Sequence, residues 1–165
     1  MGMLTASSAS VVNTSSVAAR AFGKIDRNDL NNEVKYSATK AYGDAKLANI
    51  LFAKELDRRY GSPGISAVAF HPGNVRTSFA SDTTSSMRFI YQTPLRRLTG
   101  LISPEKGAEP LVWLADGIPG RDWVSDECYE KQTIAKTNPQ AGDAQLAADL
   151  WEKSVDMVGL ATTAR

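Results

Sequence analysis

Hydrophobic and polar positions along the first half of the chain predict two short strands with a long helix between them. Residues 10–14 and 65–70 are short apolar, β-prone runs, which is typical of strands buried in a sheet. Residues 41–60 place apolar side chains at helical spacing and end before the Pro63-Gly64 breaker. Four side chains of this helix are expected to face the core or a subunit contact: Leu47, Ile50, Leu51 and Leu56.

The same kind of pattern continues through the second half. Ser103 and Pro104 suit the N-cap and the first position of a helix that runs to about Asp116. A short strand near 127–129 and a final amphipathic helix over 143–159 follow. We find no internal repeat and no second domain boundary, so the pattern predicts a single domain.

Three stretches carry no clear periodicity. Residues 1–9 are rich in Ser, Thr and Ala and are expected to be loose. The stretch after strand 10–14 is expected to be a polar loop, with turns over 26–33. Residues 78–103 contain scattered large apolar side chains, which are compatible with a small helical subdomain.

Composition gives no sign of a nucleic-acid-binding, membrane-spanning or metal-binding protein. The net charge is +1, from 19 basic and 18 acidic residues, so nothing indicates binding to nucleic acid or to an anionic membrane. No apolar run reaches the length of a membrane span, and the N-terminus does not resemble a signal peptide, so we expect a cytoplasmic protein. A single cysteine, Cys128, and a single histidine, His71, make a metal site unexpected.

Candidate chemistry first appears in the long helix, where Tyr42 and Lys46 stand at i and i+4 and therefore share one face. A lysine ammonium next to a tyrosine favours the phenolate and lowers the tyrosine pKa, as general acid–base catalysis near pH 7 requires. The spacing alone is weak, because Tyr36 and Lys40 repeat it just upstream.

Two further motifs give the pair a context. The first strand reads Val11-Val12-Asn13-Thr14-Ser15-Ser16, and the second is followed by His71-Pro72-Gly73-Asn74-Val75-Arg76-Thr77. Together with Ala41 to Phe52, they resemble the C-terminal half of a short-chain dehydrogenase/reductase, most closely the retinol-dehydrogenase-like branch. The resemblance covers about residues 10–160. It implies a Rossmann-like, doubly wound parallel sheet, and it favours Tyr42 over Tyr36 because only Tyr42 carries the Lys-Leu-Ala-Asn continuation.

The resemblance also implies roles for individual residues. Tyr42 is expected to donate or accept the proton, Lys46 to assist it and bond the coenzyme ribose, and Ser16 to polarise the substrate carbonyl, with Ser15 the weaker candidate. The coenzyme is expected to be NADP or NAD, and the residues expected to bind it are Tyr42, Lys46, Pro72, Gly73, Val75 and Thr77. The substrate is a small carbonyl or alcohol, residues 78–103 cover it, and the Tyr42-bearing helix joins two copies in a homo-oligomer.

Two departures from the family pattern leave alternatives open. None of the twelve glycines forms the glycine-rich turn that seats the coenzyme pyrophosphate, and the family's catalytic asparagine would lie upstream of Met1. We therefore expect a C-terminal part whose strand 10–14 has an unpaired edge that favours association. The alternatives are a non-catalytic fragment or interaction module, an enzyme reconstituted from two chains, and an extended-type relative acting on nucleotide sugars.

Overall fold

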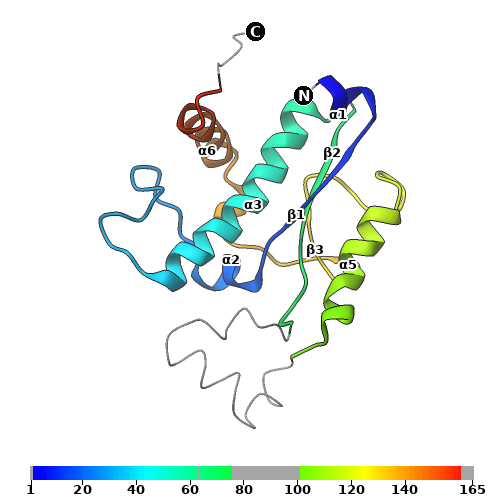
Figure 1. Cartoon of the computed structure of the whole chain (residues 1–165), viewed down its shortest axis with the longest axis horizontal. Helices are drawn as coiled ribbons and strands as arrows, with labels where there is room; N and C mark the ends of the chain where they lie inside the picture. The colour runs from blue at the N-terminus through cyan, green and yellow to red at the C-terminus, as the bar shows by residue number, and fades with distance from the viewer. Residues whose placement is uncertain (1, 63, 76–100, 161–165) are drawn as a thin grey trace.

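The computed structural model describes residues 2–62, 64–75 and 101–160, and a four-stranded sheet lies at its centre (Figure 1). Strands β1 (Ser10–Thr14), β2 (Ser66–His71) and β3 (Cys128–Glu130) run parallel in that order. Strand β4 (Thr133–Ile134) pairs antiparallel with β3. This open, mostly parallel sheet with helices confirms the predicted α/β class.

Alternating side chains divide the sheet into two packed faces. Val11, Ala67 and Ala69 lie in a core cluster with helices α2 (Val17–Phe22), α3 (Ala38–Tyr60) and α6 (Ala144–Met157). Val68 and Phe70 point to the other face and pack in a second cluster with side chains of α5 (Pro104–Asp116). Helices therefore cover both faces, as a parallel sheet requires (Figure 1).

Helix α3 is the longest element and supplies much of the first core. It begins three residues before the predicted start, because the Ser37 side chain caps it by accepting a hydrogen bond from the Lys40 amide. All four of its predicted apolar residues are at most 3% exposed and lie in the core cluster: Leu47, Ile50, Leu51 and Leu56. Their burial stabilises the fold by roughly 1.5–3 kcal/mol each.

Two predictions for the first quarter of the chain were wrong. Residues 1–9, expected to be loose, include the helix α1 (Gly2–Ala6). The polar loop expected after β1 begins with α2, which is only six residues long. Asn138 donates hydrogen bonds to the carbonyls of Ala19 and Gly23 at the end of α2, so a residue far along the chain stabilises a helix too short to show periodicity.

The C-terminal segment closes over the first core. A 3-10 helix, η3 (Pro139–Gly142), leads into α6, which packs along α3 and buries Leu146 and Ala147. The helices predicted from Ser103 and over 143–159 are confirmed with small shifts at their ends. Most of segment 78–103 lies outside the described residues. None of the described helices has the length and apolar character needed to cross a membrane.

Candidate functional site

The predicted site residues gather at the carboxyl ends of β1 and β2. The Ser15 amide donates to the Phe70 carbonyl at 2.6 Å, so the loop after β1 begins beside the end of β2. Ser16 caps α2 shortly after the end of β1, and Pro72 directly follows β2. Open α/β sheets bind ligands in the crevice beyond these strand ends, so the site lies where the fold favours one.

The two adjacent serines have different partners. Ser15 is only 2% exposed, and its hydroxyl donates to the Lys46 carbonyl of α3 at 2.7 Å. Ser16 is half-buried, and its side-chain oxygen caps α2 by accepting from the Ala18 amide at 3.2 Å. The Ser15 hydroxyl proton is therefore used within the fold, whereas the Ser16 hydroxyl proton is not used by its cap. This arrangement favours Ser16 as the residue that contacts substrate.

Tyr42 and Lys46 lie side by side on α3, near these strand ends. The Lys46 ammonium nitrogen is 5.7 Å from the centre of the Tyr42 ring, which is within the range of a cation–π contact. The same nitrogen lies 3.4 Å from the Thr14 carbonyl at the end of β1. A positive charge is thus held next to the phenol and beside the loop that carries Ser16.

Gly43, the residue after Tyr42, lets the end of α2 approach α3. A Cβ atom at position 43 would stand 2.7 Å from the Phe22 carbonyl carbon and 2.8 Å from the Gly23 nitrogen. Any other residue would push the two segments apart. Because Ser16 begins α2, this close approach helps to set the position of Ser16 relative to Tyr42.

The loop after β2 is held by the start of α5. Gly73 has φ of +81°, a backbone conformation that favours glycine. Val75 forms a parallel bridge with Ile102, and it packs so closely on Gly107 that a Cβ there would lie 2.4 Å from it. Pro72, Gly73 and Val75 therefore form an anchored backbone segment at the site. Thr77 lies outside the described residues.

His71 and Cys128 lie beneath the site and line one small cavity with Ser16. Burial lowers the pKa of His71, although Glu130 opposes this effect and Arg20 adds to it, so the neutral imidazole is favoured. Burial also raises the pKa of the Cys128 thiol to about 11. Because the thiolate is the reactive form of cysteine, Cys128 is a packing residue rather than a nucleophile.

These residues fit one half of a nicotinamide coenzyme. Lys46 carries an ammonium whose bond to Thr14 is long, and the positive φ of Gly73 shapes a half-buried backbone turn after β2. Such groups suit the ribose and nicotinamide. The glycine-rich turn that would hold the pyrophosphate is absent from the sequence.

Sequence patterns missed one polar residue of this region, Asn49. Its side-chain nitrogen donates to the Thr14 carbonyl at 2.8 Å, next to the Lys46 contact with the same oxygen. Asn49 follows Lys46 by three residues and Tyr42 by seven, so all three share one helical face. That spacing was the available signal.

No family model matches the chain, but several curated proteins with related names are similar to it in sequence. The Streptomyces protein DnrU, named as a daunorubicin C-13 ketoreductase, is 40% identical over 83% of this chain and 45% of its own length. Human retinol dehydrogenase 13 is 37% identical over 91% of this chain and 46% of its own length. Mouse retinol dehydrogenase 14 is 33% identical over 97% and 48%.

A solved structure has a similar fold. The crystal structure of an uncharacterized protein from Mycobacterium paratuberculosis matches with a TM-score of 0.58 and 28% identity, over 91% of this chain and 50% of that one. The chain thus spans about half the length of the relatives it matches.

Proposed function

The chain belongs to the short-chain dehydrogenase/reductase family, and from this premise we propose that its residues form the proton-transfer centre of an NAD(P)-dependent oxidoreductase. The reaction interconverts a small carbonyl compound and an alcohol. The main support is the geometry at the strand ends, where the Lys46 ammonium lies 5.7 Å from the Tyr42 ring and the Lys46 carbonyl is bonded to Ser15, the neighbour of Ser16.

Each side chain has a defined part in carbonyl reduction. The Ser16 hydroxyl donates a hydrogen bond to the substrate carbonyl oxygen and polarises it. Tyr42 then delivers its phenolic proton to that oxygen, and Lys46 stabilises the negative charge left on the phenol. In alcohol oxidation the proton moves the other way. A bound nicotinamide coenzyme, NADP or NAD, supplies or accepts the hydride.

The same proposal assigns the coenzyme contacts. Lys46 bonds the ribose, and the backbone of Pro72, Gly73 and Val75 lies along the nicotinamide, with Thr77 completing the segment. The names of the relatives include a ketoreductase and retinol dehydrogenases, which supports a small-molecule substrate. A homo-oligomer formed through α3 and a cytoplasmic location remain predictions.

An interaction module without turnover is the second candidate. The sequence lacks the glycine-rich turn for the pyrophosphate, and β1 is an edge strand of the described sheet. An open edge presents unpaired backbone groups that can recruit another strand.

A coenzyme titration separates the two candidates. NADH and NADPH fluorescence is followed as each is titrated with the purified 165-residue chain, its Lys46→Met variant and a matched control, Lys35→Met, at an exposed position. The proposal predicts saturable binding that Lys46→Met weakens and Lys35→Met does not. A folded chain that binds neither coenzyme contradicts coenzyme binding by these residues in the 165-residue chain, and it favours the interaction module for this chain.

An activity screen then tests the chemistry. The chain is incubated with the coenzyme that it binds and with aliphatic, aromatic or retinoid aldehydes and ketones, and reduction of the carbonyl is measured. The Tyr42→Phe variant is the control. Reduction that persists in Tyr42→Phe contradicts the assigned proton donor.

A further inference from the structure

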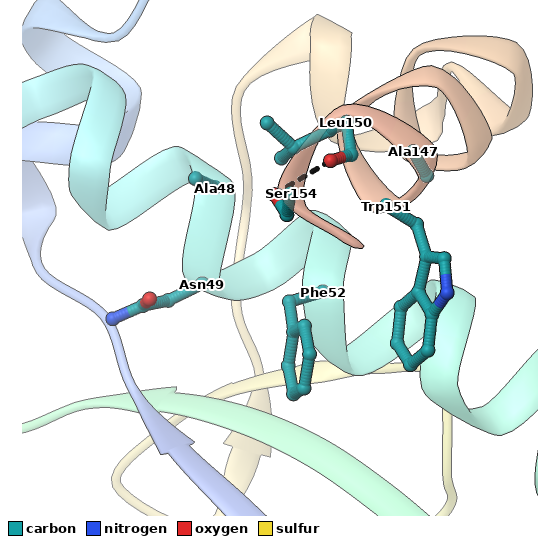
Figure 2. Close-up of a pocket in the computed structure, with 7 residues that line it drawn as sticks. All are labelled: Ala48, Asn49, Phe52, Ala147, Leu150, Trp151 and Ser154. Atoms are coloured by element: carbon teal, nitrogen blue, oxygen red, sulfur yellow. Dashed lines mark hydrogen bonds between the residues drawn. The ribbon is translucent and has the colours of Figure 1, made fainter. Parts of the chain in front are cut away.

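Two side chains of α3 converge on one backbone oxygen at the end of β1. Asn49 donates to the Thr14 carbonyl at 2.8 Å, which is an ordinary hydrogen-bond distance, whereas the Lys46 ammonium approaches the same oxygen only to 3.4 Å. Figure 2 shows the Asn49 side chain extending away from Phe52 and Trp151, toward the blue strand β1. Asn49 therefore lines the groove between α3 and α6 while its side-chain nitrogen bonds to β1.

The Thr14 carbonyl is available because the β1–β2 ladder does not use it. In a parallel pair, alternate residues of a strand bond to the neighbour. The Ala9 carbonyl and the Ser15 amide both bond to β2, so Thr14, which lies between them in the alternate set, turns its carbonyl away from β2. A carbonyl oxygen has two lone pairs and can accept from both Asn49 and Lys46.

A second hydrogen bond runs in the opposite direction between the same two elements. The Ser15 hydroxyl of the strand end donates to the Lys46 carbonyl of the helix at 2.7 Å. Neighbouring residues of the strand thus bond to positions 46 and 49 of the helix. This double link fixes the loop that carries Ser16 against the helical turn that carries Lys46.

We propose that Asn49 is a positioning residue that keeps the Lys46 ammonium available for the site. By donating to the Thr14 carbonyl, Asn49 reduces the attraction of that oxygen for Lys46. Without Asn49, the ammonium moves closer to Thr14, because a charged donor forms a stronger hydrogen bond with a carbonyl than a neutral amide does. Lys46 then leaves the Tyr42 ring. A loss of coenzyme affinity in such a variant would follow only if the proposed function holds. The displacement of Lys46 is expected whether or not it holds.

Chemical labelling tests the displacement without coenzyme or substrate. The lysines of the intact chain are reductively methylated with limiting reagent, and mass spectrometry gives the rate at Lys46 relative to exposed Lys35 in the same molecule. In Asn49→Leu the relative rate at Lys46 is expected to fall about threefold to tenfold, as one strengthened hydrogen bond implies. The matched control is Asn31→Leu, whose side chain bonds only to neighbouring Glu33 among the described residues, and it leaves the rate unchanged.

Asn49→Asp keeps the shape of the side chain, so it remains informative even if Asn49→Leu does not fold. It removes the donor and adds a carboxylate that attracts Lys46, and the rate at Lys46 is expected to fall further. An unchanged rate at Lys46 in a folded Asn49→Asp or Asn49→Leu chain overturns the proposal.

Coenzyme titration of the same variants separates this inference from the proposed function. If the chain binds NADH or NADPH, Asn49→Leu is expected to raise the dissociation constant about threefold to tenfold. Failure of the wild-type chain to bind coenzyme contradicts the proposed function alone, because the labelling result still decides the role of Asn49.

Discussion

Two tyrosine–lysine pairs with the same spacing stand six residues apart in the sequence, and their lysines contact different groups in the structure. In the first pair, Tyr36 is 73% exposed and precedes the N-cap of α3, so it does not share a helical face with Lys40. Lys40 donates to the Asn32 side chain at 2.6 Å and forms an ion pair with Asp44. Asp44 is buried and also accepts from the Lys24 amide, so Lys40 belongs to a structural network.

In the second pair, both residues lie within α3, and the ammonium faces an aromatic ring and a neutral carbonyl. Lys46 contacts Tyr42 and Thr14, and neither contact neutralises its charge. The two pairs show that the i, i+4 spacing brings a tyrosine and a lysine together only where both residues lie within the helix. Whether the charge can act on a ligand depends on which other groups already bind it.

The largest expected effect separates the two tyrosines. Tyr42→Phe removes the proposed proton donor and is expected to lower any carbonyl-reducing turnover at least ~10²-fold, whereas Tyr36→Phe should change it very little. Steady-state kinetics with a shared carbonyl substrate gives both values. Equal losses from the two substitutions would remove the basis for distinguishing the pairs.

The two adjacent serines are also expected to differ, with Ser16 affecting turnover and Ser15 affecting stability. Ser16→Ala is expected to lower turnover about 10²-fold, because it removes the proposed hydrogen bond to the developing oxyanion. Ser15→Ala should mainly lower stability, by about 1 kcal/mol, with a loss of turnover below tenfold. Urea unfolding and kinetics are measured on both variants. A larger kinetic loss in Ser15→Ala would reverse the assignment.

The two lysines are expected to differ in stability. Lys40→Met leaves the buried Asp44 carboxylate without its ion pair and should destabilise the fold by about 1–3 kcal/mol. Lys46→Met leaves the Thr14 carbonyl with its Asn49 bond and should cost clearly less. Urea denaturation of the two variants beside wild type measures the difference, and a greater loss from Lys46→Met would contradict a structural role for the first pair.

The smallest expected effect is the pH dependence of the stability of the fold that arises from His71. Because burial lowers the pKa of His71 from its ordinary value of 6.5, the folded chain binds fewer protons than the unfolded chain as the pH falls below 6.5. His71 should therefore make the fold less stable as the pH falls from 7 toward 5. His71→Asn removes this contribution, and its urea midpoint should depend less on pH. An identical pH dependence in both chains would contradict the shift.

Local sequence signals predicted most elements of the fold. The apolar runs identified β1 and β2, and the Ser103-Pro104 start identified α5, because these elements depend on burial patterns and caps encoded within a few residues. The start of α3 was missed by three residues because the cap is Ser37. Helix α2 was missed because its stability depends on Asn138, which lies more than a hundred residues away.

The placement of Tyr42 and Lys46 on one face follows from the sequence by itself, since helical geometry makes residues four apart neighbours. Tertiary structure alone decided which groups those residues meet. The Ser15 bond to Lys46 and the Asn49 bond to Thr14 join elements that are distant in the chain, and the Lys40 bond to Asn32 joins the helix to a preceding turn. Such partners depend on how strand ends and helices pack, and local spacing carries no information about that packing.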